Sequence, residues 1–164
     1  MSRIDEWNQR HRAAHDDSRE PAPVVVEAAD LAKAGRALDL ASGRGRNANC
    51  LADRGWNVVT VDAAIAAMPR VLCDLERDPL PFFDESFDLV VNVFFLHRPL
   101  FAEIRRVLRP GGFFAAQIHI RGINPAFCVK PGELKDVFAD WEIVKYREQE
   151  TAELIARKRL TANR

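Results

Sequence analysis

The stretch from residue 37 to residue 55, ALDLASGRGRNANCLADRG, decides the fold class of this 164-residue chain. It begins with a short apolar run, passes through a turn with two glycines, and continues in a pattern typical of a helix. Glycines in such a turn permit positive φ angles and close approach of a ligand, and the following helix offers unpaired N–H groups. This order predicts a cradle for a nucleotide-type ligand.

The remainder of the chain repeats the alternation of apolar runs and helical segments. The predicted strands are ALDL at 37–40, NVVTV at 57–61, FDLVVNVFF at 87–95 and GGFFAAQIHI at 111–120, with crossover helices over 46–54 and 99–108. Runs without a polar face are typical of parallel strands covered by helices on both sides, so we expect a doubly wound α/β sheet. A helix over 131–140 precedes two extended runs, 141–148 and 151–160, that predict an antiparallel hairpin.

The chain shows no repeat and no domain boundary, so residues 1–164 are expected to form a single domain. Residues 1–20 form an N-terminal arm with a polar helix over 4–15, and a second helix is predicted over 23–33.

Composition excludes several partners. Lys and Arg together number 24, as do Asp and Glu, so no basic field favours nucleic acid. The N-terminus lacks the apolar segment of a secretory signal, and the longest apolar run is too short to span a bilayer, which predicts a cytoplasmic protein without membrane contact. Three scattered cysteines predict neither a disulfide framework nor a zinc site. The sequence leaves open whether the chain forms a homodimer.

Two carboxylates narrow the choice of ligand. Asp39 lies within the first predicted strand, where a charge is unfavourable unless a polar group uses it. Asp62 ends the next strand, seventeen residues after Gly45, where an acidic side chain can accept the hydroxyls of an adenosine ribose. Asp39 would repel a pyrophosphate but attract a ligand with an amino group and a sulfonium. The glycine turn alone would fit a purely structural turn equally well.

Five motifs, taken in order, carry a resemblance to a known family. They are DLASGRGRN, VTVD, CDLE, PFFDESFDLVVNVFFLH and LRPGG. Together they resemble the class I S-adenosylmethionine-dependent methyltransferases, in particular a small bacterial branch of the tellurite-resistance and thiopurine type. The resemblance runs from Ala37 to the C-terminus, with a weaker similarity around Trp7. It implies a Rossmann-like sheet of order 3-2-1-4-5-7-6 with strand 7 antiparallel, in agreement with the predicted hairpin.

The resemblance also implies roles for individual residues, with S-adenosylmethionine as cofactor and the arm lying over it. Asn92 and Val93 would line the methyl-bearing side, and Arg46 would reach the methionine carboxylate unless it is a solvated first-turn arginine. The remaining implied contacts are to the methionine part from Asp39, Ala41, Gly43 and Gly45, to the ribose from Asp62, and to the adenine from Ala63, Asp74 and Leu75.

One segment departs from the family pattern. Only eleven residues, AAIAAMPRVLC, separate Asp62 from Asp74, less than half of what the family usually places there. With Pro69 in its middle, this segment has room for about one helical turn and a short strand. Because the family takes one wall of the adenine pocket from this region, residues 63–68 would supply that wall more sparsely. Reduced cofactor affinity, or loss of activity, follows as an alternative.

Methyl transfer is an in-line displacement that requires alignment and exclusion of water but no metal. A base helps a protonated acceptor, and His97, which follows the fourth predicted strand, is the first choice, ahead of His119. The alternative for His97 is a packing role before Pro99. The chain reads NVFF where an NPPY-type tetrapeptide would mark base or glutamine substrates in the family, so small-molecule acceptors are favoured.

Three functions therefore compete. The first is an S-adenosylmethionine-dependent methyltransferase acting on a small molecule, with no metal. The second is a catalytically inactive cofactor-binding or structural domain of the same fold. The third, a nicotinamide-dependent oxidoreductase, ranks last because the single tyrosine, Tyr146, lies in the predicted hairpin and forms no Tyr-x-x-x-Lys pair.

Overall fold

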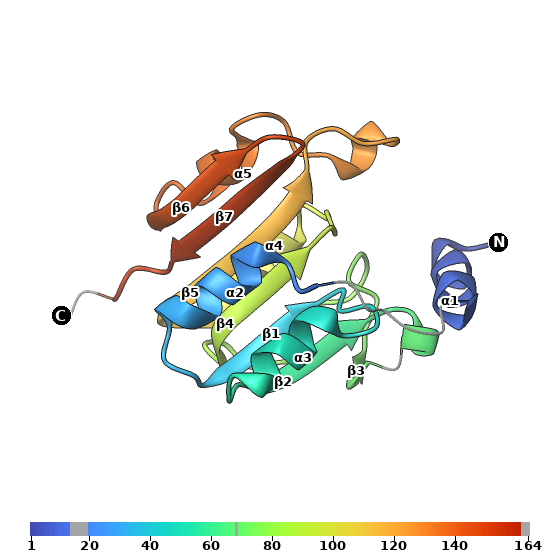
Figure 1. The fold of residues 1–164 in the computed structure, drawn as a ribbon, viewed down its shortest axis with the longest axis horizontal. Coiled ribbons are helices and arrows are strands. Elements are labelled where there is room, and N and C mark those ends of the chain that lie inside the picture. Colours follow the sequence, from blue (N-terminus) through green and yellow to red (C-terminus); the bar gives the residue numbers. More distant parts are fainter. Residues whose placement is uncertain (14–19, 68, 162–164) are drawn as a thin grey trace.

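A computed structural model describes residues 1–13, 20–67 and 69–161. Its centre is a seven-stranded sheet in the order β3-β2-β1-β4-β5-β7-β6 (Figure 1). β7 runs antiparallel to both β5 and β6, and the other pairs are parallel. The predicted order is therefore confirmed. The strands are β1 (Arg36–Leu40), β2 (Asn57–Asp62), β3 (Val71–Leu72), β4 (Phe87–Val93), β5 (Leu108–His119), β6 (Glu142–Glu148) and β7 (Thr151–Arg157).

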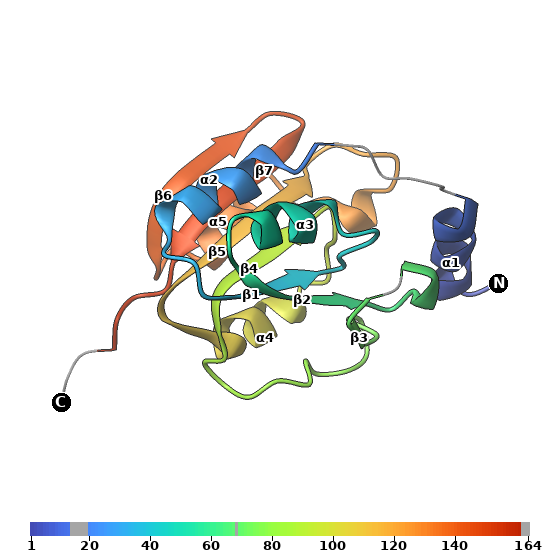
Figure 2. The same ribbon diagram turned by 60° about the horizontal axis from the view of Figure 1, so that its bottom comes forward.

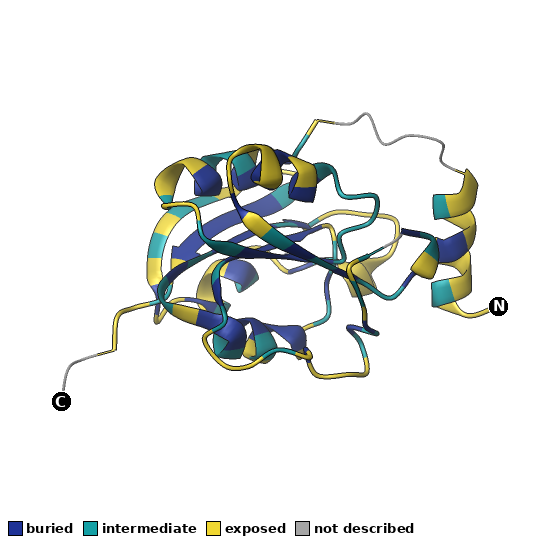
Figure 3. Cartoon of the chain, turned by 90° about the horizontal axis from the view of Figure 1, so that it is seen from below, coloured by how far each residue is buried: buried dark blue, intermediate teal, exposed yellow. Residues whose placement is uncertain are grey.

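Helices cover both faces of the sheet, and each side has its own apolar core. On one face, α2 (Pro23–Leu31) and α3 (Arg46–Asp53) bury side chains such as Val24, Val25 and Leu51 against the sheet. On the other, α4 (Leu100–Val107) and α5 (Glu133–Val137) contribute Ile104 and Leu134 to the larger core. Figure 2 shows α2 and α3 opposite α4 across the sheet. Burial follows this layering, with the central strands β1, β4 and β7 largely buried and the outer helix faces exposed (Figure 3).

The N-terminal helix α1 (Arg3–Ala13) stands apart from these layers. It lies beside the short 3₁₀ helix η1 (Ile65–Ala67) at the β3 edge of the sheet, in both Figure 1 and Figure 2. Neither apolar core includes a residue of α1. The predicted arm helix over 4–15 is thus placed as far as residue 13, and the rest of that prediction lies outside the described residues.

The connection between β2 and β3 is as short as the sequence predicts. Among its described residues it holds only η1 before the two-residue strand β3, which pairs with β2 at Val61 and Asp62. A second 3₁₀ helix, η2 (Pro125–Phe127), lies between β5 and α5.

The start of β5 differs from the prediction. The sequence places a helix over 99–108 and ends it at Pro110-Gly111-Gly112, whereas α4 ends at Val107 and β5 already begins at Leu108. The pairing with β4 shifts between Phe87 and Leu89, so the Pro-Gly-Gly segment is an irregularity inside the strand. Proline and glycine at such a position are typical of bulges, which explains why a stop signal read from sequence is part of the sheet.

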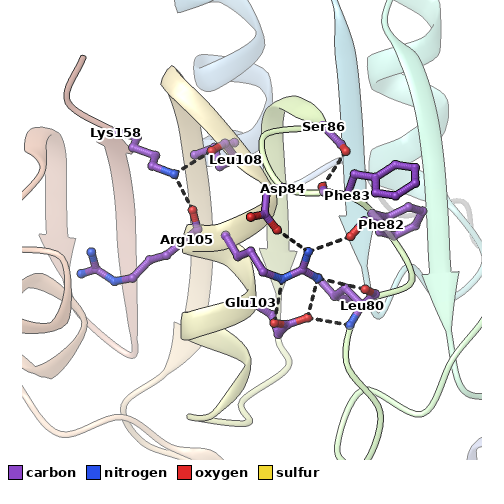
Figure 4. A network of polar contacts seen from close by, with 10 residues as sticks. Leu80, Phe82, Phe83, Asp84, Ser86, Glu103, Arg105, Leu108 and Lys158 are labelled. Atoms are coloured by element: carbon purple, nitrogen blue, oxygen red, sulfur yellow. Dashed lines mark hydrogen bonds and ion pairs between the residues drawn. The ribbon is translucent and has the colours of Figure 1, made fainter. Parts of the chain in front are cut away.

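A polar network fixes the amino ends of β4 and β5 (Figure 4). Arg106 donates to Glu103 at 2.8 and 3.0 Å, to Asp84 at 3.0 Å, and to the carbonyls of Phe82 and Leu80 at 2.7 and 2.9 Å. Lys158, which follows β7, donates to the carbonyl oxygens of Arg105 and Leu108 at 2.6 and 2.8 Å. These hydrogen bonds give partners to carbonyl oxygens at the carboxyl end of α4 and in the loop before β4. The polar groups at this end of the strands are thus paired within the protein.

Candidate functional site

A cavity of about 440 Å³ opens at the carboxyl edge of the sheet, on the far side from that network. This is where ligands of doubly wound sheets bind. The walls come from the ends of β1, β2 and β4, the segment after β3, and one face of α1. The lining residues are Arg3, Ile4, Trp7, Arg10, His11, Ala41, Ser42, Gly43, Arg44, Arg46, Asn47, Asp62, Ala63, Ala64, Asp74, Leu75, Glu76, Val93, Phe94 and Phe95.

The glycine turn between β1 and α3 forms the floor of this cavity. Gly43 and Gly45 have φ of 54° and 87°, the left-handed region that glycine reaches without strain. Ala41, a non-glycine residue at the end of β1, is held at φ 52°. Gly45 is the N-cap of α3 and contributes no capping side chain, and the first-turn residues Arg46 and Asn47 line the cavity, so the positive end of this helix lies at the cradle.

Asp62 joins the floor to the adjacent wall. One carboxylate oxygen accepts a hydrogen bond from the Gly43 backbone N–H at 2.9 Å, and the other accepts one from the Ala64 N–H at 2.8 Å. A carboxylate has about four acceptor positions, so two remain after these bonds. Asp62 therefore both shapes the turn and keeps acceptor capacity toward the cavity it lines.

Asp39 lies beneath the cradle and is almost fully buried, with 1% of its surface exposed. Burial, reinforced by the negative charge of Asp62, raises the pKa of Asp39 to about 7, while a hydrogen bond from the Ala48 backbone and the charge of Arg46 act in the opposite direction. A carboxyl with this pKa gains strongly from any cation placed beside it.

Three buried polar atoms converge on the same edge without a hydrogen-bond partner among the described residues. They are Asp39 Oδ2, Ser42 Oγ and Asn92 Oδ1. Asp39 and Asn92 lie on the neighbouring strands β1 and β4, whose register pairs Leu40 with Asn92. Buried acceptors left unpaired are unfavourable, so their concentration beside a cavity indicates a site built for a ligand that donates hydrogen bonds.

The residues predicted for the nucleoside end also line the cavity. Ala63, Asp74 and Leu75 form one side of it, and Val93 lies at the end of β4. Asp74 accepts from the Glu76 backbone N–H at 3.1 Å and holds its position at the end of β3 in this way. Asp39, Gly45 and Asn92 are not part of the lining and support it from behind.

Arg46 lines the cavity as well, so the predicted reach toward a bound carboxylate is geometrically available. Its guanidinium donates to the carbonyl oxygen of Glu20 at 2.7 Å and lies 5.8 Å from the ring centroid of Phe94. Phe94 follows β4 with φ 59° and stacks on His119, with ring centroids 4.7 Å apart. Phe94 is not among the predicted site residues, because its only signal in the sequence is an aromatic side chain just beyond a strand that ends at the site.

His97 is separated from this cavity. It lines a second, open cleft of about 470 Å³, together with Arg98, Pro99 and Phe127. The His97 carbonyl accepts from the Leu100 N–H at 2.9 Å, which begins α4, and Arg98 pairs with Glu133 through two hydrogen bonds at 2.8 and 2.9 Å. The two hollows share Arg3 and Glu76 in their linings. The structure thus brings the predicted cofactor residues together around the first cavity and places His97 in the adjacent cleft.

Across the described residues there is no group of three or more His, Cys, Asp or Glu side chains placed to hold a metal ion. In the same part of the chain, no helix combines the length and apolar character needed to cross a bilayer.

Residues 38–116 match the methyltransferase domain family. The chain is 28% identical over 152 residues to Hemagglutinin 1 of Eikenella corrodens, an alignment that covers 76% of this chain and 50% of that protein. The chain spans half or less of the length of the first curated relatives it matches.

Solved structures share the fold. TehB from Haemophilus influenzae superposes with a TM-score of 0.76 at 20% identity, covering 93% of this chain and 67% of that one. The 1,6-didemethyltoxoflavin-N1-methyltransferase of Burkholderia thailandensis, solved with 1,6-didemethyltoxoflavin and S-adenosylhomocysteine, gives 0.71 at 19% identity, with 95% and 87% covered. At these identities the likeness shows a common fold and carries no further conclusion about substrates.

Proposed function

We propose that this chain binds S-adenosylmethionine and transfers its methyl group to a small molecule, because residues 38–116 match the methyltransferase domain family and the sheet has the strand order that the resemblance implies. The cofactor supplies an electrophilic methyl group on a sulfonium. The chain's own residues have to bind and orient it, exclude water and admit the acceptor.

One observation carries this proposal: the three unpartnered buried atoms of Asp39, Ser42 and Asn92 beside the glycine cradle. Their acceptor oxygens match an ammonium group, which offers three donors and a positive charge. The cradle N–H groups suit a carboxylate, and the remaining acceptor capacity of Asp62 suits two hydroxyls. An α-amino acid joined to a nucleoside through a cationic sulfur has this set of groups in this order.

For the methyl acceptor we propose only a size class, a small molecule. The hollows on either side of the Arg3–Glu76 ion pair, which is 2.6 Å long, are of the size that small molecules occupy. The neighbour from Burkholderia thailandensis, crystallised with a small heterocycle, supports an acceptor of this size. We assign His97 as the group that would take up a proton from an acceptor that lies in the second cleft and reaches the cofactor cavity past Arg3 and Glu76, the residues that both hollows share.

Isothermal calorimetry with S-adenosylmethionine, S-adenosylhomocysteine and NADH tests the cofactor assignment. We expect the first two to bind, and Asp62→Ala to weaken that binding about 10- to 100-fold, because loss of Asp62 removes hydroxyl acceptors and frees the Gly43 turn. Asp78→Ala is the matched control, since Asp78 is exposed and lies outside the cavity lining. Binding of NADH instead would overturn the proposal in favour of an oxidoreductase.

The shortened connection between β2 and β3 favours a second candidate, a domain that binds the cofactor without turnover. Single-turnover assays on a panel of thiol, amine and hydroxyl acceptors separate the two. Cofactor binding with methyl transfer to any of them, lowered in His97→Ala, supports the enzyme. Tight binding with no transfer in any of them supports the second candidate.

A further inference from the structure

Helix α1 presents an unusual surface for a helix that belongs to neither core. Its two large apolar residues, Ile4 and Trp7, are three positions apart and therefore share a face, and both line the cavity. Trp7 is 46% exposed although it lines the cavity, and its ring contacts two residues of its own helix, stacking on His11 with centroids 6.0 Å apart and lying 5.0 Å from the Arg10 guanidinium. The one buried residue of α1 is polar, Asn8.

The side chain of Asn8 explains how α1 is held. Its Oδ1 accepts a hydrogen bond from the backbone N–H of Ala66, in η1, at 2.8 Å. Ala66 belongs to the shortened connection, so this bond joins the arm to the segment in which a 3₁₀ turn stands between β2 and β3. A polar side chain that is 8% exposed on a surface helix is costly unless it makes such a bond.

Contacts at both ends of α1 attach the helix to the rest of the protein on two sides of the cavity. Arg44, in the glycine turn, donates to the carbonyl oxygen of His11 at 2.6 Å. At the other end, Arg3 forms a 2.6 Å ion pair with Glu76, which follows β3. The helix is therefore tied to the glycine turn and to the segment after β3, which both line the cavity, and to η1, which directly follows the lining residues Ala63 and Ala64.

We propose that α1 replaces the wall that the short β2–β3 connection cannot supply, with Asn8 as the positioning residue and Trp7 as the contact to the purine nucleoside part of the ligand. This inference rests on the proposed function for the identity of that ligand. Asn8 does not reach the cavity lining itself and acts by seating η1 and α1 against each other. The site is then complete only when the arm is docked.

Amide hydrogen exchange tests the docking without any ligand. In the full-length protein we expect the Ala66 amide to be protected, and Asn8→Ala to raise its exchange rate about tenfold or more. Asn8→Asp keeps an acceptor oxygen and should retain most of the protection. Glu6→Ala, an exposed position on the same helix, is the control. Unchanged exchange at Ala66 in Asn8→Ala would overturn the role of Asn8.

Binding of S-adenosylhomocysteine tests the wall. Because contact between a base and an aromatic ring contributes strongly to affinity, Trp7→Ala should weaken binding about tenfold, and Asn8→Ala by a similar factor. Melting temperatures of the ligand-free variants should stay close to that of the parent protein, since no residue of α1 belongs to either core. A merely structural role would instead lower the melting temperature and leave affinity per folded molecule unchanged.

The two experiments keep the proposals apart. If the parent protein binds S-adenosylhomocysteine and neither variant weakens that binding, the wall is refuted while the proposed function stands. If the parent protein binds no S-adenosyl ligand, the proposed function fails, and with it the assignment of Trp7 to a nucleoside. The Ala66 exchange result then still decides whether Asn8 docks the arm.

Discussion

The two edges of the sheet treat buried polar groups in opposite ways. At the amino edge, Arg106 donates to two carboxylates and two carbonyls, and Lys158 donates to two further carbonyls. At the carboxyl edge, acceptor atoms of Asp39, Ser42 and Asn92 are buried with no partner among the described residues. The polar groups at the amino edge find their partners within the protein, whereas those at the carboxyl edge would find them only in a ligand.

This contrast separates residues that serve stability from residues that serve binding. A paired polar network stabilises the chain regardless of ligand, and breaking it destabilises the fold. A buried carboxyl with one oxygen left without a hydrogen-bond partner in the described part of the chain, such as that of Asp39, destabilises the free protein and is retained where a ligand offsets that cost. Substitutions at the two edges should therefore have effects of opposite sign on the free protein.

The largest effect is expected at Asp39. Unfolded, this carboxyl ionises near its ordinary pKa of 3.8, whereas folded it stays protonated up to a pKa of about 7. The folded state thus binds more protons between these values, stability falls as pH rises from about 4 to about 7, and the deficit is constant above that. Asp39→Asn should raise the free energy of unfolding at pH 8 by roughly 2 to 4 kcal/mol.

Urea unfolding of the ligand-free proteins at pH 8 and pH 5 measures this. The gain from Asp39→Asn should be smaller at pH 5, where part of the deficit is absent. The same variant should bind S-adenosylhomocysteine more weakly, since it loses the charge beside the ligand's ammonium group. A variant that is less stable than the parent protein at pH 8 would break the contrast between the two edges.

The next effect is expected at Arg106. Replacement by Gln removes the donors to Glu103, Asp84 and Leu80, and should lower the free energy of unfolding by about 2 kcal/mol, because hydrogen bonds to charged groups are lost and carbonyls are left unpaired. The affinity of the folded variant for the cofactor should equal that of the parent protein. Arg109→Gln, at the more exposed ion pair with Asp88, is the control and should lose under about 1 kcal/mol.

The smallest effect compares two glycines that cap helices in the same conformation. Gly45 and Gly132 have φ of 87° and 79°, and an added Cβ would lie 3.9 Å from its nearest neighbour at either site. Alanine at each should lower the free energy of unfolding by about 1 kcal/mol, the penalty of a left-handed backbone. Calorimetry should show weaker cofactor binding for Gly45→Ala alone. If Gly132→Ala weakened cofactor binding as much as Gly45→Ala, the cofactor cradle would not be confined to the glycine turn between β1 and α3.

The sequence was sufficient for most of the fold. The apolar runs and the C-terminal hairpin predicted a doubly wound sheet, the resemblance added its strand order, and both are confirmed. The eleven-residue spacing between Asp62 and Asp74 correctly predicted the truncated connection. These features depend on local patterns and on chain length, which a sequence displays directly.

The parts that were missed depend on contacts between distant segments. The Pro-Gly-Gly segment reads locally as a stop, yet Gly111 donates to the carbonyl of Lys158, 47 positions away and directly after β7, at 2.7 Å, and this distant contact keeps the segment in the sheet. In the sequence, Asn8 is one of several polar residues of the arm, and only the structure shows that it accepts a hydrogen bond from the distant Ala66 N–H. His97 lies near a strand end, as predicted, but the sequence could not reveal that it faces a different hollow.

The two-residue strand β3 has a further consequence for the outer rim of the sheet. It pairs only with the end of β2, so residues 57–60 form part of an open edge, and such an edge is a template for association with other chains. Arg70 lies along that edge: its backbone N–H donates to Thr60 Oγ1 at 2.8 Å and its guanidinium to the Val58 carbonyl at 3.4 Å. The same truncation thus leaves residues 57–60 of β2 without a strand partner on this side among the described residues, and the positive charge of Arg70 lies along that backbone.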